Sequence, residues 1–206
     1  MGNPITSETQ IANLSLAIIG QKPITDITDT TNKNSRECLR WYGLARDGVL
    51  RRAYWNWAQK RATLSQDATA PEYEWSYRYA LPEDYIKLRK FNSYPETYPE
   101  DAYQVEDGYI LTDDETAEIR YTYRVEDVTK FDSLFIDAFS IHLAAKLARI
   151  ISGSTQTPDN LDVKYERVLS MAMNEDANEN RVNHRGVEGL LKNSVLRNRR
   201  FSSPIG

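Results

Sequence analysis

The segment from Ser133 to Ile151 is apolar around almost its whole helical circumference, and this limits the possible folds more than any other feature. Asp137, Lys146 and Arg149 interrupt it, so it does not indicate a membrane span. A helix that is apolar nearly all round belongs in the centre of a protein core. We therefore expect a protein with no membrane association, in which this helix is surrounded by others.

Three further helices are predicted from apolar residues spaced three or four apart. The first runs from about Ser7 to Ile19, because Ser7 and Gln10 form a capping-box pattern and Gly20 is a stop signal. Its predicted apolar face holds Ile11, Leu14 and Ile18.

The second helix is predicted from near Ser35 to about Ala53, and the fourth from Pro158. Gly43 or Gly48 in the second is expected where another helix packs closely. The predicted apolar stripe of the second is Cys38, Leu39, Tyr42, Ala45, Val49, Leu50 and Ala53, and that of the fourth is Leu161, Tyr165, Val168, Leu169 and Ala172.

The middle of the chain differs in kind, because it is rich in tyrosine and alternates apolar and polar residues with a period of two. This pattern predicts a small antiparallel sheet, with a hairpin turn at 106–108. The expected strands are 74–79, 86–91, 103–105, 109–111 and 118–125.

Together these elements predict an α+β protein. Residues 1–65 and 130–180 would form a helical bundle of about four helices, 66–129 an inserted β-rich region, and 181–206 an extended tail. The tail carries six basic residues and one acid, a charge of +5 in a chain whose net charge is −4. Opposite charges on body and tail favour an acidic partner or a neighbouring copy of the same chain. The acidic balance disfavours non-specific coating of nucleic acid.

Few residues carry recognisable chemistry. His142 and His184 lack metal-ligand spacing, and a single cysteine, Cys38, excludes an intrachain disulfide and fits a reducing cytosol. Acidic groups at 113–115 and 126–127 would need to converge in a pocket to hold a metal or act as acid and base, and are otherwise expected to be solvated. No phosphate-binding glycine loop or nucleophile elbow occurs. We expect no cofactor, no metal and no enzymatic activity.

The aromatic residues allow three interpretations. They could stack on nucleic acid bases, form a protein interface, or pack across the strands of the sheet. The acidic character of this region argues against the first, and the other two stay open. Trp41, Tyr42, Tyr54, Trp55 and Trp57 are candidates for contacts between copies of the chain.

Several loosely spaced motifs occur in a familiar order: ANLSLAIIGQKPI (12–24), WNWAQKRATL (55–64), YRYALPEDYIKL (77–88) and RYTYRVEDVTKFDSLFIDAFSIHLAAKLA (120–148). Over about Ile11 to Ala177 the chain resembles the head-to-tail adaptor of short-tailed bacteriophages, the tail tubular protein A family. That resemblance implies a structural virion protein of the viral tail and neck, made in the host cytoplasm.

In this family a dodecameric ring joins the portal to the tail nozzle and extends the channel for genome ejection. The implied partners are therefore the portal protein, the tail nozzle protein and further copies of the chain, with double-stranded DNA passing through without specific binding. The resemblance implies that Arg181, Arg185, Leu190, Leu191, Lys192, Leu196, Arg197, Arg199, Arg200 and Phe201 bind the portal. The expected nozzle-side or subunit-interface residues are Trp75, Tyr77, Tyr79, Tyr85, Tyr121 and Tyr123.

Two alternatives from other classes remain at this point. A small metal-dependent enzyme built on the acidic loops would lose its activity on Asp113→Ala. A soluble module that binds single-stranded nucleic acid through its tyrosines would lose affinity on Tyr121→Ala.

Overall fold

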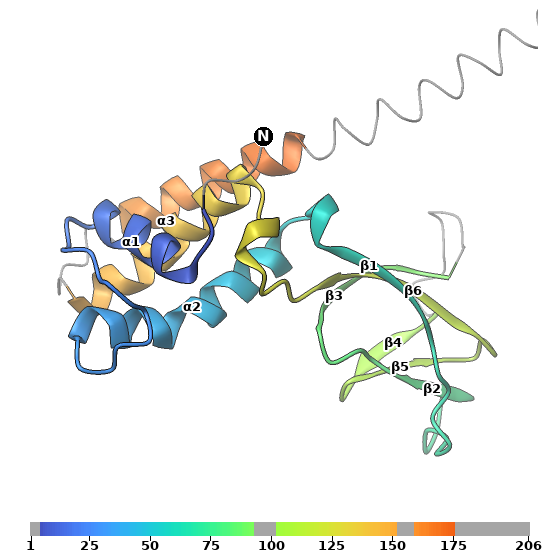
Figure 1. Cartoon of the computed structure of the whole chain (residues 1–206). Helices are drawn as coiled ribbons and strands as arrows, with labels where there is room; N and C mark the ends of the chain where they lie inside the picture. Colours follow the sequence, from blue (N-terminus) through green and yellow to red (C-terminus); the bar gives the residue numbers. More distant parts are fainter. Residues whose placement is uncertain (1–4, 93–101, 152–158, 176–206) are drawn as a thin grey trace, which may run out of the picture.

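The computed structural model describes residues 5–92, 102–151 and 159–175, and within them the fold is α+β. Helices and strands gather in two separate parts that α2 joins (Figure 1). The helical part holds α1 (Glu8–Ile18), α2 (Lys33–Arg52), α3 (Ser133–Ile151) and a last helix over 159–175. The β part holds β1 (Gln59–Leu64), β2 (Tyr77–Ala80), β3 (Tyr85–Phe91), β4 (Gln104–Glu106), β5 (Tyr109–Thr112) and β6 (Ala117–Tyr123).

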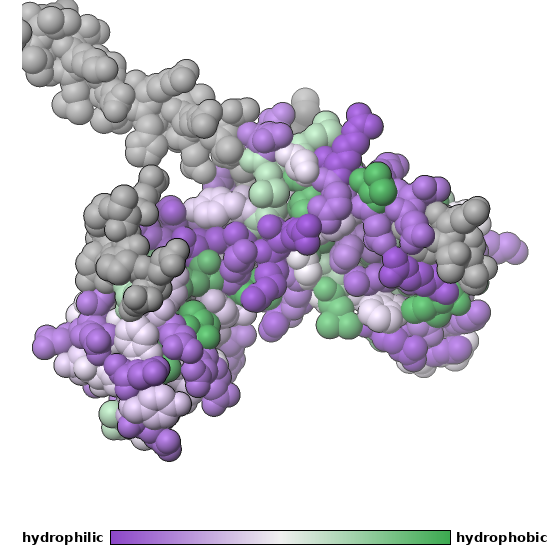
Figure 2. Space-filling model, turned by 180° about the vertical axis from the view of Figure 1, so that it is seen from behind, coloured by the Kyte–Doolittle hydropathy of each residue, from purple (hydrophilic) through white to green (hydrophobic). Residues whose placement is uncertain are grey.

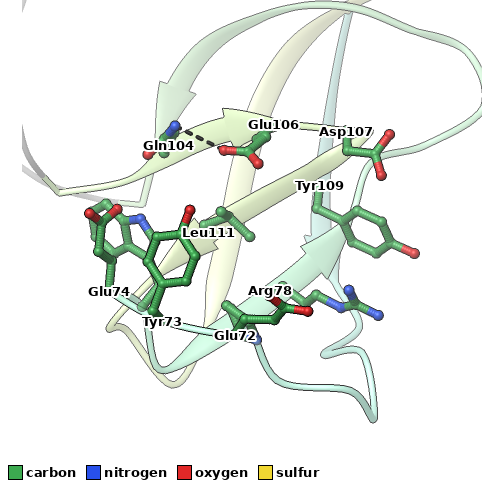
Figure 3. Close-up of a pocket in the computed structure, with 11 residues that line it drawn as sticks. Glu72, Tyr73, Glu74, Arg78, Gln104, Glu106, Asp107, Tyr109 and Leu111 are labelled. Atoms are coloured by element: carbon green, nitrogen blue, oxygen red, sulfur yellow. Dashed lines mark hydrogen bonds between the residues drawn. The ribbon is translucent and has the colours of Figure 1, made fainter.

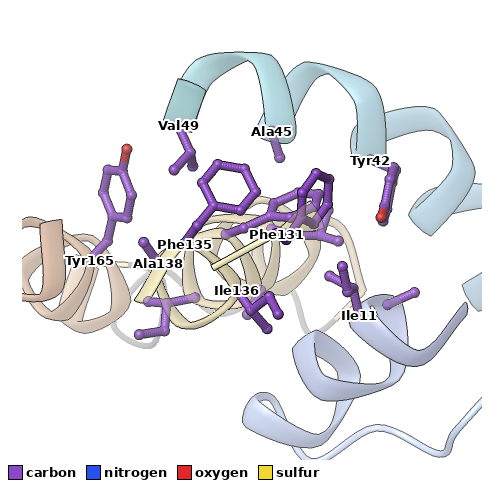
Figure 4. Packing of buried hydrophobic residues seen from close by; sticks show 14 of the residues in the cluster. Ile11, Tyr42, Ala45, Val49, Phe131, Phe135, Ile136, Ala138 and Tyr165 are labelled. Atoms are coloured by element: carbon purple, nitrogen blue, oxygen red, sulfur yellow. The ribbon is translucent and has the colours of Figure 1, made fainter. Parts of the chain in front are cut away.

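Helix α3 is the centre of the helical part, as its apolar sequence predicted. Figure 4 shows α1, α2 and the last helix around it, with their buried side chains directed towards it. Phe135, Phe139 and Leu143 are among the largest fully buried side chains. Gly48 of α2 lies against α3, because an added Cβ would be 3.5 Å from Nε2 of His142. Gly43 has open space instead, so only Gly48 marks a close approach.

The ends of α1 confirm the sequence signals. Ser7 and Gln10 form the reciprocal capping box, and Gly20 takes a φ of +68°, which suits glycine. The predicted apolar face was right for Ile11 but wrong for its other two residues. Leu14 and Ile18 are exposed, and α1 buries Ile11, Ala12, Ser15 and Leu16. Leu39 is the corresponding error on α2, since it too is exposed.

The β part contains two three-stranded antiparallel sheets, where the sequence predicted one. Their strand orders are β1-β6-β3 and β2-β5-β4. The boundary predicted at residue 65 falls after β1, although β1 pairs with β6 from Gln59↔Thr122 to Leu64↔Ala117 and belongs to the sheet. Asp107 and Gly108 both have positive φ in the turn between β4 and β5, as the predicted hairpin requires.

Polar bonds hold the β part against α2. The Arg51 guanidinium donates to the carbonyl oxygen of Ile86 on β3 at 2.6 Å. Arg89 on β3 donates to the carbonyl oxygens of Leu50 and Ala53, where α2 ends. Asp47 of α2 accepts from Nε of Arg124, just after β6, at 2.8 Å. The two Arg89 bonds satisfy carbonyls that the end of a helix leaves without partners, and together the four bonds fix the angle between the two parts.

Candidate interaction surfaces

Two of the six predicted interface residues lie inside the β part. Tyr79 and Tyr121 are 1% and 4% exposed. The Tyr79 hydroxyl donates to the carbonyl oxygen of Asp114 at 3.0 Å, and that of Tyr121 to Oδ1 of Asp84 at 3.0 Å. Burial and the Asp84 carboxylate raise the pKa of Tyr121 to about 12. These two side chains therefore pack the sheets and are not available to a partner, which corrects their prediction as contact residues.

The other four residues of that set are half-buried. Tyr85 stacks on Tyr121 with ring centroids 6.0 Å apart, and the Lys60 ammonium lies 4.1 Å from the centre of the Tyr123 ring. Tyr77 packs against the core of the β part, and Trp75 lines a surface groove. The structure thus brings Tyr85, Tyr121 and Tyr123 together and places Trp75 elsewhere.

Several helix aromatics predicted to contact a neighbouring copy face inward. Tyr42 and Trp55 are buried, and Trp57 packs on Phe135 with ring centroids 5.0 Å apart. Trp55 donates its indole N–H to the carbonyl oxygen of Val49 at 3.0 Å. Tyr54 lies beneath Arg89 and Arg120, and Trp41 beneath Lys146. Tyr42, Trp55 and Trp57 therefore stabilise the core and do not project towards a neighbouring copy.

Exposed aliphatic side chains mark the outer surfaces of the helical part. They lie on every helix of the helical part: Leu14 and Ile18 on α1, Leu39 and Leu44 on α2, Ile150 near the end of α3, and Val163, Met171 and Met173 on the last helix. Leu44 is 64% exposed and Val163 is 72% exposed. On the face that Figure 2 shows, apolar residues emerge at several separate points among hydrophilic ones. Sequence reasoning missed these surfaces, because it assigned Leu14, Ile18 and Leu39 to buried faces.

Four of the five acidic positions form side-chain hydrogen bonds or ion pairs with residues close by: Asp113, Asp114, Glu126 and Asp127. Asp113 accepts from the backbone N–H and hydroxyl of Ser76 at 2.9 and 2.8 Å, and Asp114 accepts from the Asn92 side chain. Asp127 caps the short helix η2 (Val128–Lys130), and Glu126 lies 3.7 Å from Arg46. Within the ranges that the structure describes, no three acidic, histidine or cysteine side chains are grouped as metal ligands would be.

In the helical part, Cys38 is buried and His142 is half-buried. Burial raises the pKa of the Cys38 thiol to about 11, so it is protonated at neutral pH. Burial, with the charge of Lys146, lowers the pKa of His142 to about 4. The His142 ring stacks on Tyr165 of the last helix, with centroids 4.5 Å apart. His142 is therefore a packing residue between α3 and the last helix.

A groove of about 470 Å³ lies on the sheet β2-β5-β4. Figure 3 shows Glu72, Tyr73 and Glu74 at one side of it and Glu106, on β4, at another. Arg78 forms part of the lining, but its guanidinium is held by Asp67 at 3.1 Å and lies 4.6 Å from the centre of the Tyr109 ring. Sequence reasoning missed this groove, because its lining comes from a loop and three strands.

The predicted portal-binding residues, Arg181 to Phe201, lie outside the described residues, as does His184. Among the helices of the described ranges, none has the length and apolarity that crossing a bilayer requires. The sequence matches no protein-family model and no curated protein.

Proposed function

We propose that this chain is a non-enzymatic structural protein of the virion: a head-to-tail adaptor of a short-tailed bacteriophage. Copies of it would form a ring, dodecameric in the family it resembles, between the portal and the tail nozzle. The ring would extend the channel through which the genome is ejected. The order of motifs along the chain suggests this function.

The single observation that carries the proposal is the arrangement of exposed aliphatic residues around α3. Leu14 and Ile18 are exposed on α1, and Val163 and Met171 are exposed on the last helix. A ring requires two different surfaces on each copy, because each subunit contacts its neighbours head to tail. Apolar residues on separate helices supply two such surfaces, whereas a two-fold dimer needs a single self-complementary patch.

The fixed junction between the parts also supports the proposal. A subunit that links two other proteins must hold its two ends at a constant angle, and Arg51, Arg89 and Arg124 bind across that junction. The charge outside the tail is −9, with 29 acidic against 20 basic residues. A net negative body suits a channel wall past which DNA must slide without being bound.

The test is electron microscopy of the purified protein, alone and mixed with the portal protein encoded in the same genome. We expect rings, either free or docked on the portal. Small globular particles in both samples would overturn the adaptor proposal.

A matched pair of variants tests the proposed side surfaces. Val163→Glu should prevent ring formation, because it places a charge in an apolar contact while leaving the fold intact. Asn160→Glu adds the same charge at an exposed position of the same helix and should still assemble. Assembly of both variants would remove the last helix from the interface.

Truncation tests the role of the tail. A chain ending at Asn180 should stay folded but lose portal binding, because it lacks all the residues proposed to bind the portal. Circular dichroism checks the fold, and co-sedimentation with the portal checks binding. Unchanged binding would show that the tail does not hold the portal.

A further inference from the structure

The acidic charge of the chain is concentrated in its β-rich region. Residues 66–129 contain sixteen Asp and Glu against six Lys and Arg, a net charge of −10. Part of this charge lines the groove on sheet β2-β5-β4, where Glu72, Glu74, Glu106 and Asp107 are all exposed. The one base in the lining, Arg78, is already held by Asp67. The groove therefore has a surplus of negative charge available to a ligand.

Aromatic rings give the groove a second property that suits a cation. Tyr73 is 72% exposed, an unusual state for so large a side chain. Tyr109 already holds the Arg78 guanidinium over its face. Aromatic faces attract guanidinium groups, and carboxylates bind them through two parallel hydrogen bonds. A ligand that fits both features bears arginine side chains and an apolar or aromatic group.

The chain itself contains such a segment. Residues 197–201 read RNRRF, with three arginines followed by a phenylalanine, in a tail of charge +5. Twenty-one residues separate it from Glu175, a reach of about 70 Å when extended. This reach is more than twice the length of α2, which spans about 30 Å between the helical part and the β part. Arg52 at the end of α2 bonds to Glu166 at 2.9 Å, so the last helix runs beside the point where the β part begins.

We propose that the groove of sheet β2-β5-β4 is a docking site for residues 197–201. The carboxylates of Glu72, Glu74 and Glu106 bind the arginines, and the exposed ring of Tyr73 provides the remaining contact. This docking is independent of the proposed adaptor function, because it requires neither a portal nor a ring. In an adaptor it would hold the tail on the β part until a stronger partner displaced it.

Limited proteolysis of the full-length protein provides the test, because trypsin cleaves after arginine. The groove variant Glu72→Gln, Glu74→Gln, Glu106→Gln should be cut at Arg197 to Arg200 about threefold to tenfold faster than the unmodified chain, as expected for a few exposed ion pairs. The control variant Glu83→Gln, Glu115→Gln, Glu118→Gln removes the same charge from other exposed sites of the region. It should be cut at the unmodified rate, whereas equal rates in all three proteins would overturn the proposal.

A second test measures the NMR amide resonances of the strands that form the groove. In full-length protein, Arg197→Ala, Arg199→Ala, Arg200→Ala should shift the amide resonances of β4 and β5. Arg181→Ala, Arg185→Ala, Lys192→Ala removes the same charge from the same tail and should leave them unchanged. Identical spectra for both triple variants would contradict docking. Because no portal is present, a negative result would leave the adaptor proposal to the microscopy described above.

Discussion

The two parts of the molecule have cores of different kinds. The core of the helical part consists largely of aliphatic side chains and phenylalanines, among them Phe135, Phe139 and Leu143. The core of the β part contains six buried residues in the described ranges, and two of them are Tyr79 and Tyr121 with their hydroxyls bonded. The helical part is thus stabilised mainly by apolar burial, and the β part depends more on specific polar bonds.

A charge in the larger core should have the greatest effect. Leu143 is fully buried in α3, so Leu143→Asp places a carboxylate where it has neither water nor a partner. The cost is several kcal/mol, comparable to the total stability of a domain, and we expect the helical part to unfold. Circular dichroism should show the loss of helix.

The matched control is Leu44→Asp on α2, which makes the same substitution at an exposed position. It should melt within a few degrees of the unmodified protein. A folded Leu143→Asp protein would mean that α3 is not the centre of the core.

Shortening a side chain in the core of the β part should have a more local effect. Ile110 on β5 is fully buried, and Ile110→Ala leaves a cavity that costs about 2–5 kcal/mol. Because this core is separate from the helical one, we expect hydrogen exchange to lose protection in β2 and β5 and not in α3. Val105→Ala on β4, at an exposed site, is the control and should change little. Equal loss of protection in α3 would show that the two parts unfold as one.

The sequence predicted these two parts unequally, for physical reasons. The bounds of α3, Ser133–Ile151, match the prediction because a long apolar helix is recognisable from its own residues. Strand β1 was missed because its identity depends on pairing with β6, whose paired residues lie 53 to 63 positions further along the chain. Strand β2 starts at Tyr77 and not at 74, where Glu74 has a φ of +67° that no alternation pattern reveals.

The candidate surfaces were predicted less well than the fold. Periodicity on α1 is satisfied equally by Ile11 with Leu14 and Ile18 and by the face that is actually buried, so spacing alone could not choose between them. Aromatic content likewise does not distinguish Tyr79, which is buried, from Tyr73, which is exposed. What decides both cases is which neighbour covers the side chain, and that is a property of tertiary packing.

Loss of the junction should have a smaller effect than loss of either core. Arg89 bonds to Thr122 on the neighbouring strand and to two carbonyl oxygens at the end of α2. Arg89→Ala should cost about 1.5–3 kcal/mol, the usual range for hydrogen bonds to a charged group. We expect faster hydrogen exchange at the end of α2 and in β3. Lys87→Ala on the exposed face of β3 is the control, and similar changes in both variants would mean that Arg89 does not join the parts.

The smallest expected effect concerns His142, a titratable group in the mainly apolar core. Burial, then the charge of Lys146, lowers its pKa from 6.5 to about 4, while Asp162 acts in the opposite direction and Arg52 adds to the lowering. The folded chain therefore binds this proton less readily than the unfolded chain. Neutral His142 therefore leaves the folded state at full stability above pH 6.5. As the pH falls from 6.5 towards 4, the unfolded chain takes up the proton first and the folded state loses stability. Because the His142 ring is only partly buried, solvent reduces this loss of stability. The effect should be confined to the contact between the last helix and α3, where His142 stacks on Tyr165.

Carboxylates titrate in the same range, so the measurement must compare two proteins. Melting temperatures of the unmodified chain and of His142→Gln, taken from pH 7 to pH 4.5, isolate the histidine, because glutamine cannot be protonated there. The unmodified chain should lose stability more steeply than His142→Gln as the pH falls. Parallel curves would mean that His142 is as solvated in the folded state as in the unfolded one. A steeper fall of melting temperature with pH in the unmodified chain than in His142→Gln would identify the contact between α3 and the last helix as acid-sensitive. The rest of that core is stabilised by apolar burial, which does not depend on pH.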